Sequence, residues 1–154
     1  MIEIHPATIF DQTVRVPGSK SYTHRALIAS ALSTGLCRIE NGLDSDDTRL
    51  TRTGLRQLGI QLAVQKTHWT VTGASGQFKR CAEAIYLGNS GTSMRLLTAL
   101  CALGKGAYRL TGSLRMQARP IQDLLDGLHQ IGVPARAVAD KGCPPVEIQG
   151  GVIS

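Results

Sequence analysis

The pattern of apolar and polar positions along the chain predicts alternating helices and strands. Apolar residues recur at helical spacing in four segments, at 21–32, 44–59, 92–103 and 120–131. Shorter runs rich in apolar and β-branched residues predict strands near 13–16, 36–40, 60–64, 67–72, 84–87, 107–111, 133–138 and 146–148. Strands that alternate with helices in this way indicate an α/β protein.

The order of these elements recurs in the second half of the chain. Arg25 and Arg95 stand at corresponding places in the first and third helices, and LGI at 58–60 corresponds to IGV at 131–133. The recurrence predicts two βαβαββ units, at 13–81 and 82–154, preceded by a separate segment at 1–12. A chance repetition of glycines and leucines is the alternative.

Composition restricts the class of protein. The chain has 154 residues, 42% of them hydrophobic and 18% charged, which is enough to form one or two compact units and makes disorder unlikely. No apolar run approaches the roughly 20 residues that cross a bilayer. The first residues lack the basic start and apolar run of a signal peptide, so a cytoplasmic protein without membrane contact is expected.

The charge balance favours acidic partners. Seventeen Lys and Arg residues against eleven Asp and Glu residues give a net charge of +6, which suits phosphorylated metabolites, nucleic acid or acidic lipid headgroups. The six aromatic residues are dispersed and offer poor stacking platforms, so nucleic acid is an unlikely partner.

The four cysteines do not suggest a metal site. They form no CxxC pair and have no histidine at ligand spacing, so no metal is expected. Cys37 in an expected strand and Cys101 in an expected helix are interpreted as small buried thiols in a reducing compartment.

The candidate chemistry lies where two loops open helices. Gly18 to Ser21 precede the first helix, and Gly88 to Thr92 precede the third. Free backbone N–H groups at such helix starts favour a bound anion. Because the helix dipole contributes only about 0.3 to 1 kcal/mol, Lys20 and the loop hydroxyls would have to supply the rest. Neither loop has the spacing of a nucleotide P-loop or a dinucleotide fingerprint, and ordinary capped glycine turns are the alternative.

Three other groups of residues near these loops have simpler interpretations. Arg115 and Arg119 precede Pro120, the expected first residue of the fourth helix, and a solvated loop is the favoured explanation for them when the cluster is taken without the rest of the sequence. The aspartates at 44, 46 and 47 are interpreted as helix caps and dipole partners rather than as acids or bases in catalysis. His24 is interpreted as a helix-surface residue.

Taken together, the motifs resemble one family in composition and in order. They are PGSKS at 17–21 with Arg25, LDSDD at 43–47, LGNSGTSMR at 87–95, RMQARPI at 115–121 and QGG at 149–151. This combination resembles the amino-terminal part of the 5-enolpyruvylshikimate-3-phosphate synthase family, across almost the whole chain. Leu96 is a departure, because the family usually has proline there.

The resemblance implies an activity and a set of site residues. The family transfers the enolpyruvyl group of phosphoenolpyruvate to the 5-hydroxyl of shikimate 3-phosphate and releases inorganic phosphate, with no metal or organic cofactor. By resemblance, Lys20 is catalytic. The residues implied to bind shikimate 3-phosphate are Lys20, Ser21 and Arg25. Those implied to bind phosphoenolpyruvate are Lys20, Asn89, Gly91, Thr92 and Arg119.

The resemblance also implies that this chain supplies two of the six repeats of the enolpyruvyl transferase fold. The third repeat and the carboxy-terminal lobe would then be missing partners, and the segment at 1–12 would be a strand that associates with that lobe. We therefore expect the chain to bind substrate but to be inactive alone. Three alternatives stay open: a fragment of the transferase that acts on UDP-N-acetylglucosamine, a basic nucleic-acid-binding repeat, and a folded fragment without a ligand. The substrate loop of the first normally carries a reactive cysteine, which 113–119 lacks.

Overall fold

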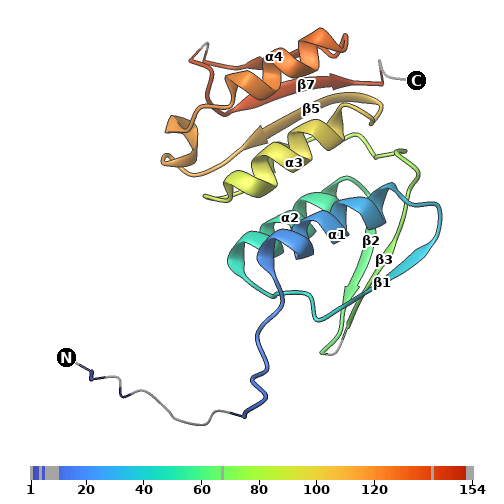
Figure 1. Cartoon of the computed structure of the whole chain (residues 1–154). Helices are drawn as coiled ribbons and strands as arrows, with labels where there is room; N and C mark the ends of the chain where they lie inside the picture. Colours follow the sequence, from blue (N-terminus) through green and yellow to red (C-terminus); the bar gives the residue numbers. More distant parts are fainter. Residues whose placement is uncertain (1, 4, 6–10, 67, 140, 152–154) are drawn as a thin grey trace.

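The computed structural model describes residues 2, 3, 5, 11–66, 68–139 and 141–151, and it confirms the α/β class (Figure 1). Its helices are α1 (Lys20–Leu32), α2 (Asp46–Gln57), α3 (Gly91–Cys101) and α4 (Gln122–Gln130), with a short 3-10 helix η1 (Met116–Ala118). Its strands are β1 (Leu36–Glu40), β2 (Gln61–Val64), β3 (His68–Thr72), β4 (Ile85–Tyr86), β5 (Gly106–Thr111), β6 (Ala135–Ala137) and β7 (Val146–Gly150). Within the described chain, no helix is long and apolar enough to cross a membrane.

The strands form two sheets with related arrangements. One sheet has the order β1-β3-β2 and the other has the order β4-β5-β7-β6. β4 pairs with β5 in parallel, and every other pair is antiparallel. The order β1-β3-β2 therefore corresponds to β5-β7-β6, although the division into units at 13–81 and 82–154 stays a prediction.

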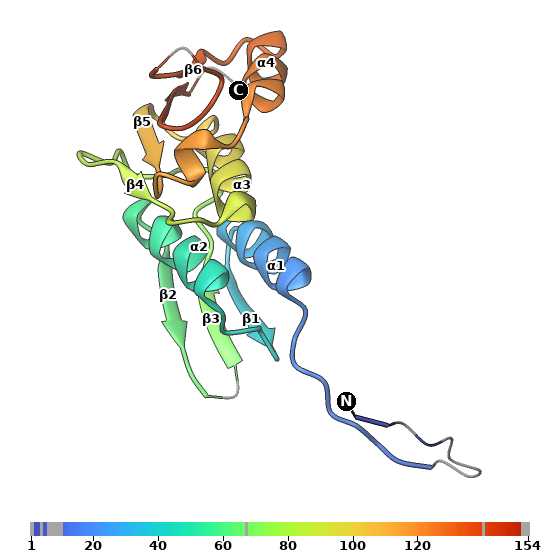
Figure 2. The same cartoon turned by 90° about the vertical axis from the view of Figure 1, so that its left-hand side faces the viewer.

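The helices lie against the sheets and against one another. Figure 2 shows α1 and α2 side by side on one face of the three-stranded sheet, with α3 next to them. Trp69 and Val71 are the buried positions of β3, as the alternation of a strand with one covered face requires. At the contact of α2 with α3, a Cβ atom on Gly54 would lie 2.5 Å from Cδ1 of Leu97, so the glycine permits this close packing.

The prediction of a strand at 13–16 is wrong. These residues have no regular secondary structure, and Val14 and Val16 are 71% and 73% exposed. Figure 1 shows this stretch leading away from the body of the molecule. A strand needs a neighbour for its backbone hydrogen bonds, and none of the described strands pairs with this stretch. Of the segment predicted at 1–12, residues 1, 4 and 6–10 lie outside the described residues, as does residue 67 of the predicted strand at 67–72.

The fourth helix also begins later than predicted. Pro120 suits the first helical turn, but Ile121 has a non-helical backbone, with φ −136° and ψ 4°, and its N–H donates to the carbonyl of Gly142 at 2.8 Å. With this contact to a loop that is distant in the sequence, Ile121 is the N-cap and the helix begins at Gln122. The preceding residues form η1 rather than an irregular loop. Leu96, where the family usually has proline, continues α3 without interruption.

The prediction of buried thiols is correct for one cysteine and wrong for the other. Cys101 is fully buried, and this burial raises the pKa of its thiol. Cys37 is only half-buried, because Ile39 is the one buried position of β1, and its Sγ lies 3.3 Å from Oγ of Ser33.

Candidate functional site

A cavity of about 350 Å³ lies where the starts of α1 and α3 meet the loop before α4. It is lined by Lys20, Asp47, Asn89, Gly91, Thr92, Arg95 and Arg119. All five residues for which the sequence predicts phosphoenolpyruvate binding are in this set. They come from three separate segments of the chain.

The loop before α1 is shaped by hydroxyl groups. Oγ of Ser19 caps the helix by accepting the N–H of Tyr22 at 3.4 Å. The hydroxyl of Thr23 donates to the carbonyl of Ser19 at 2.8 Å and accepts the N–H of Leu43 at 3.0 Å. These bonds tie the start of α1 to the segment before α2 and make Lys20 the first helical residue.

Two residues predicted to bind shikimate 3-phosphate lie outside this cavity. Ser21 and Arg25 are exposed on α1 and are not among its lining residues. Arg25 Nη1 donates to the carbonyl of Ser21 at 3.4 Å, one turn earlier in the same helix. Their assignment to a second ligand beside Lys20 stays a prediction.

Two guanidinium groups, those of Arg95 in α3 and Arg119 before α4, lie beside the start of α3. Nη1 of Arg119 donates to the carbonyl of Asn89 at 3.3 Å. Nη2 of Arg95 donates to the carbonyl of Pro120 at 2.7 Å. A Cβ atom on Gly91 would lie 3.1 Å from Nη1 of Arg119 and 3.3 Å from Nη1 of Arg95. Glycine at position 91 therefore leaves room for both guanidinium groups at the helix start.

The cavity is suited to an anion. Lys20, Arg95 and Arg119 contribute three positive charges, and Asp47 contributes the one carboxylate. That carboxylate is already engaged, because its Oδ2 lies 2.9 Å from Nζ of Lys20. Arginine forks and free N–H groups at the start of α3 are the donors that phosphate and carboxylate groups prefer. The arrangement can hold a small molecule that carries both groups.

The sequence interpretation missed the place of Asp47 in this cavity. The aspartates at 44, 46 and 47 are interpreted from the sequence as caps and dipole partners of α2. Asp46 and Asp47 do lie in its first turn, but the cap is Ser45, whose hydroxyl accepts the N–H of Thr48 in a capping box. Asp44 instead pairs with Arg49, and this hydrogen bond lowers the pKa of the Asp44 carboxyl. A carboxylate in the first turn of a helix is favoured by the dipole whether or not it has a cationic partner. The pairing with Lys20 therefore left no signal in the local sequence.

The prediction that His24 lies on the helix surface is wrong. Its side chain is 1% exposed and contacts α2. Nδ1 of His24 lies 2.8 Å from Oγ1 of Thr51, which in turn lies 2.7 Å from Oγ of Ser93. Burial lowers the pKa of His24, and the charge of Lys20 acts in the same direction, while Asp47 opposes them.

This pKa shift predicts that the chain loses stability in mild acid. Because the folded pKa is below the unfolded value of about 6.5, the unfolded state binds more protons below that pH. The free energy of unfolding is therefore expected to fall as the pH drops through about 6.5. Urea denaturation at a series of pH values measures this effect. His24→Asn is the control and should show a flatter profile; identical profiles for the two proteins would contradict the prediction.

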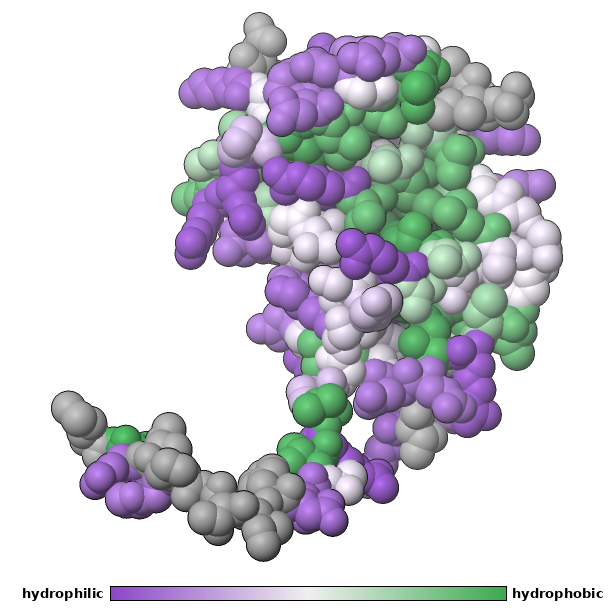
Figure 3. All heavy atoms as spheres, viewed as in Figure 1, coloured by the Kyte–Doolittle hydropathy of each residue, from purple (hydrophilic) through white to green (hydrophobic). Residues whose placement is uncertain are grey.

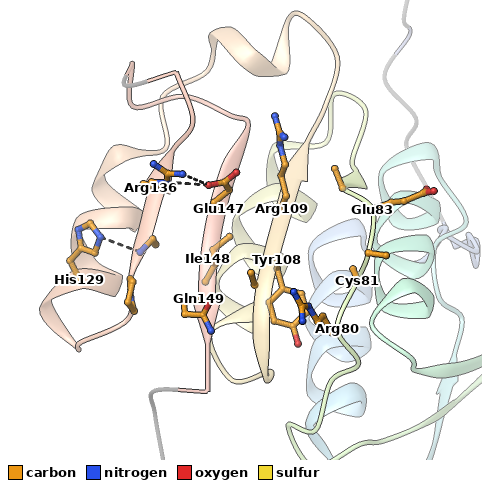
Figure 4. Close-up of a pocket in the computed structure, with 15 residues that line it drawn as sticks. Arg80, Cys81, Glu83, Tyr108, Arg109, His129, Arg136, Glu147, Ile148 and Gln149 are labelled. Carbon is orange, nitrogen blue, oxygen red and sulfur yellow. Dashed lines mark hydrogen bonds and ion pairs between the residues drawn. The ribbon is translucent and has the colours of Figure 1, made fainter.

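A second concave region lies on the outer face of the four-stranded sheet, with a volume of about 590 Å³. Figure 4 shows Arg136, Glu147 and Arg109 side by side on this face, with Arg136 directed at Glu147. Nη2 of Arg136 lies 2.7 Å from Oε2 of Glu147, so this pair is already neutralised. None of the residues predicted for a site lines this region. Among the described residues, no group of three or more His, Cys, Asp or Glu side chains is placed to hold a metal ion.

Comparisons with known proteins agree on one family. Residues 4–154 match the family of EPSP synthase (3-phosphoshikimate 1-carboxyvinyltransferase). The 3-phosphoshikimate 1-carboxyvinyltransferase of Cupriavidus necator is 44% identical over 148 residues, which are 96% of this chain and 34% of that protein. The enzyme of the same name from Methanospirillum hungatei is 48% identical over 134 residues, 87% of this chain and 31% of that protein. The chain thus spans about a third of the length of these curated relatives.

Solved structures show the same likeness. EPSP synthase from Acinetobacter baumannii superposes with a TM-score of 0.84 at 33% identity, over 90% of this chain and 32% of that one. The enolpyruvyl transferase NikO from Streptomyces tendae has a TM-score of 0.56 at 13% identity, over 84% of this chain and 29% of that one, and shows the fold alone. The predicted enolpyruvyl transferase fold is therefore confirmed.

Proposed function

Because the chain belongs to the EPSP synthase family, we propose that it is part of a 3-phosphoshikimate 1-carboxyvinyltransferase of the shikimate pathway. Such an enzyme transfers the enolpyruvyl group of phosphoenolpyruvate to shikimate 3-phosphate. The observation that supports this most is the cavity in which Lys20, Gly91 and Arg119 meet at the start of α3. Family membership favours this function over the transferase that acts on UDP-N-acetylglucosamine and over a nucleic-acid-binding repeat.

In this proposal, phosphoenolpyruvate occupies the cavity itself. Arg119 offers a planar fork that fits a carboxylate or a phosphate with two hydrogen bonds, and the N–H groups at the start of α3 complete the anion site. Asn89 and Thr92 border the same space. A ligand that carries both a carboxylate and a phosphate would use the cations on both sides of the cavity.

Shikimate 3-phosphate would bind next to it, along α1. Ser21 and Arg25 are exposed there, one turn apart. Lys20 lies between this surface and the cavity, since it begins α1 and also lines the cavity. Its ammonium group could therefore contact both ligands, which fits the catalytic role proposed for it. Its pairing with Asp47 at 2.9 Å would be exchanged in part for the substrate oxygens.

The proposed partner is the remainder of the enzyme. Figure 3 shows apolar surface over α3, bordered by polar side chains. Leu96 is half-buried and Ala99 is exposed on that helix. Because the relatives are about three times as long as the matched region, we propose that their further repeats and second lobe cover this surface. A cytoplasmic location is part of the same proposal.

A titration followed by NMR tests the substrates. With phosphoenolpyruvate, amide resonances of residues 89–92 and of Arg119 are expected to shift; with shikimate 3-phosphate, those near Lys20 and Arg25. UDP-N-acetylglucosamine at the same concentration is the control and should leave these resonances unchanged. Absence of shifts with both proposed ligands would contradict the proposal. A phosphate-release assay is expected to show no turnover by this chain alone, because groups from the rest of the enzyme are needed for the proton transfers.

Gly91→Ala is expected to lower the affinity for phosphoenolpyruvate by about tenfold or more. The added Cβ would lie 3.1 Å from Nη1 of Arg119, so the guanidinium must shift by a few tenths of an ångström at the place where it would contact the ligand. The loss of one charged hydrogen bond to the ligand there costs about 1.5 to 3 kcal/mol. Isothermal titration calorimetry measures the change. Gly127→Ala is the matched control, because a Cβ at that helical position meets nothing within 4 Å. An unchanged affinity in Gly91→Ala would contradict the placement of the ligand beside Arg119.

A further inference from the structure

A chain of buried hydrogen bonds links α1, α2 and the start of α3, next to the residues that line the cavity. It runs from His24 in α1 through Thr51 in α2 to Ser93 and Ser90 at the start of α3. Successive polar atoms lie 2.8, 2.7 and 2.7 Å apart. All four residues are at most 1% exposed. Buried polar groups of this kind must satisfy one another, because water cannot do so.

The direction of each bond follows from the number of protons available. The hydroxyl of Ser93 donates its one proton to the carbonyl of Asp47 at 3.1 Å. Its oxygen must therefore accept from both neighbours, so the hydroxyls of Thr51 and Ser90 donate to it. The oxygen of Ser90 in turn accepts the N–H of Ser93 at 3.3 Å, which is the cap of α3.

These assignments fix the protonation state of His24. Because the proton of Thr51 is already used, its oxygen accepts from His24, and Nδ1 must carry a hydrogen. Nε2 of His24 is buried and has no hydrogen-bond partner. A proton at Nε2 would then be an unpaired buried donor on a charged ring, which is costly. The neutral ring with hydrogen on Nδ1 is the form that fits.

The network also holds both sides of the cavity. Asp47 contributes its backbone carbonyl to Ser93 and its carboxylate to Lys20 on α1. Ser90 stands between Asn89 and Gly91, which line the cavity. The position of the α3 loop relative to Lys20 therefore depends on this set of buried bonds.

We propose that His24 is a positioning residue for the phosphoenolpyruvate site: with hydrogen on Nδ1, it anchors the buried chain that fixes the start of α3 relative to Lys20. The inference rests on the function proposed above and deepens it. His24 touches no substrate and acts through Thr51 and Ser93. The charged groups close enough to influence its titration are Asp47 on α2 and Lys20 on α1, and the group that its Nδ1 contacts on α2 is the hydroxyl of Thr51.

The first test is the state of the ring in the ligand-free chain. Nitrogen-15 NMR of the histidine side chain at about pH 7.5 is expected to show a neutral His24 ring with hydrogen on Nδ1. A ring with hydrogen on Nε2, or on both nitrogens, would overturn the inference. This measurement needs no ligand, so its outcome is independent of the proposed function.

The second test compares the affinities of variants for phosphoenolpyruvate by calorimetry. Thr51→Val keeps the shape of the side chain but removes the hydroxyl, and a loss of about tenfold is expected. His24→Leu is expected to lower the affinity by a similar factor. His24→Asn should restore most of the affinity, because its amide nitrogen can donate from nearly the place of Nδ1. Thr53→Val, at an exposed position of the same helix, is the control.

The outcomes separate the two proposals. If the unaltered chain binds phosphoenolpyruvate and all variants bind equally well, the positioning role is overturned while the proposed function stands. If His24→Asn loses as much as His24→Leu, the role of the Nδ1 donor is overturned. If the unaltered chain does not bind phosphoenolpyruvate, the proposed function fails and the positioning role fails with it. Urea denaturation of each variant verifies that it is folded.

Discussion

Replacing Arg119 with alanine is expected to reduce the affinity of the chain for phosphoenolpyruvate by roughly 100-fold. The guanidinium lines the cavity and one of its nitrogens is held by the carbonyl of Asn89 at 3.3 Å. A two-pronged contact with a phosphate or carboxylate would use its remaining donors. Each charged hydrogen bond contributes about 1.5 to 3 kcal/mol, and every 1.4 kcal/mol is a tenfold change.

The controls for this variant separate charge from geometry. Arg115→Ala removes the same charge from the same loop, but Arg115 does not line the cavity. The affinity of this variant for phosphoenolpyruvate should therefore be nearly unchanged. Arg119→Lys keeps the charge without the planar fork, and its affinity should lie between those of Arg115→Ala and Arg119→Ala. Equal losses in Arg115→Ala and Arg119→Ala would indicate a general electrostatic attraction and contradict the predicted contact. Isothermal titration calorimetry at two salt concentrations measures the affinities of all three variants for phosphoenolpyruvate.

The helix starts that border the cavity could be predicted because their signals are local. Small residues and hydroxyls before an apolar repeat predict a capped helix, and Ser19 and Ser90 do cap α1 and α3. The backbone donors of the anion site follow from these caps alone. The strand at 13–16 failed for the opposite reason, since strand formation depends on a partner that no local pattern specifies.

The buried polar chain could not be predicted from periodicity. His24 lies 27 residues from Thr51, and Thr51 lies 42 residues from Ser93. Polar residues within helices usually face water, which led to the interpretation of His24 as a surface residue. One signal was present: each of the three stands one turn before a fully buried leucine, at 27, 55 and 97. Residues three or four apart share a helix face, so this spacing placed all three on the buried side.

Leu97 provides the second prediction with a large effect. Its side chain is fully buried and packs against Gly54 at the contact of α3 with α2. Leu97→Ala is expected to lower the free energy of unfolding by about 2 to 5 kcal/mol, through lost burial and the cavity left behind. Urea denaturation measures the loss. Leu114→Ala is the control, because that leucine is 85% exposed and should change stability by less than about 0.5 kcal/mol.

Combining Leu97→Ala with Gly54→Ala tests whether these two positions determine the packing of α2 against α3. In the unaltered chain, Gly54→Ala places a methyl group 2.5 Å from Cδ1 of Leu97; this overpacking costs about 1 to 3 kcal/mol, against about 1 kcal/mol gained in helix propensity. With Leu97 shortened, the contact at 2.5 Å is removed, the next nearest atom is Cγ2 of Ile85 at 3.3 Å, and the same methyl group partly fills the space. Gly54→Ala should therefore destabilise the unaltered chain and stabilise Leu97→Ala. Additive effects of the two substitutions would show that the helices do not meet at this point.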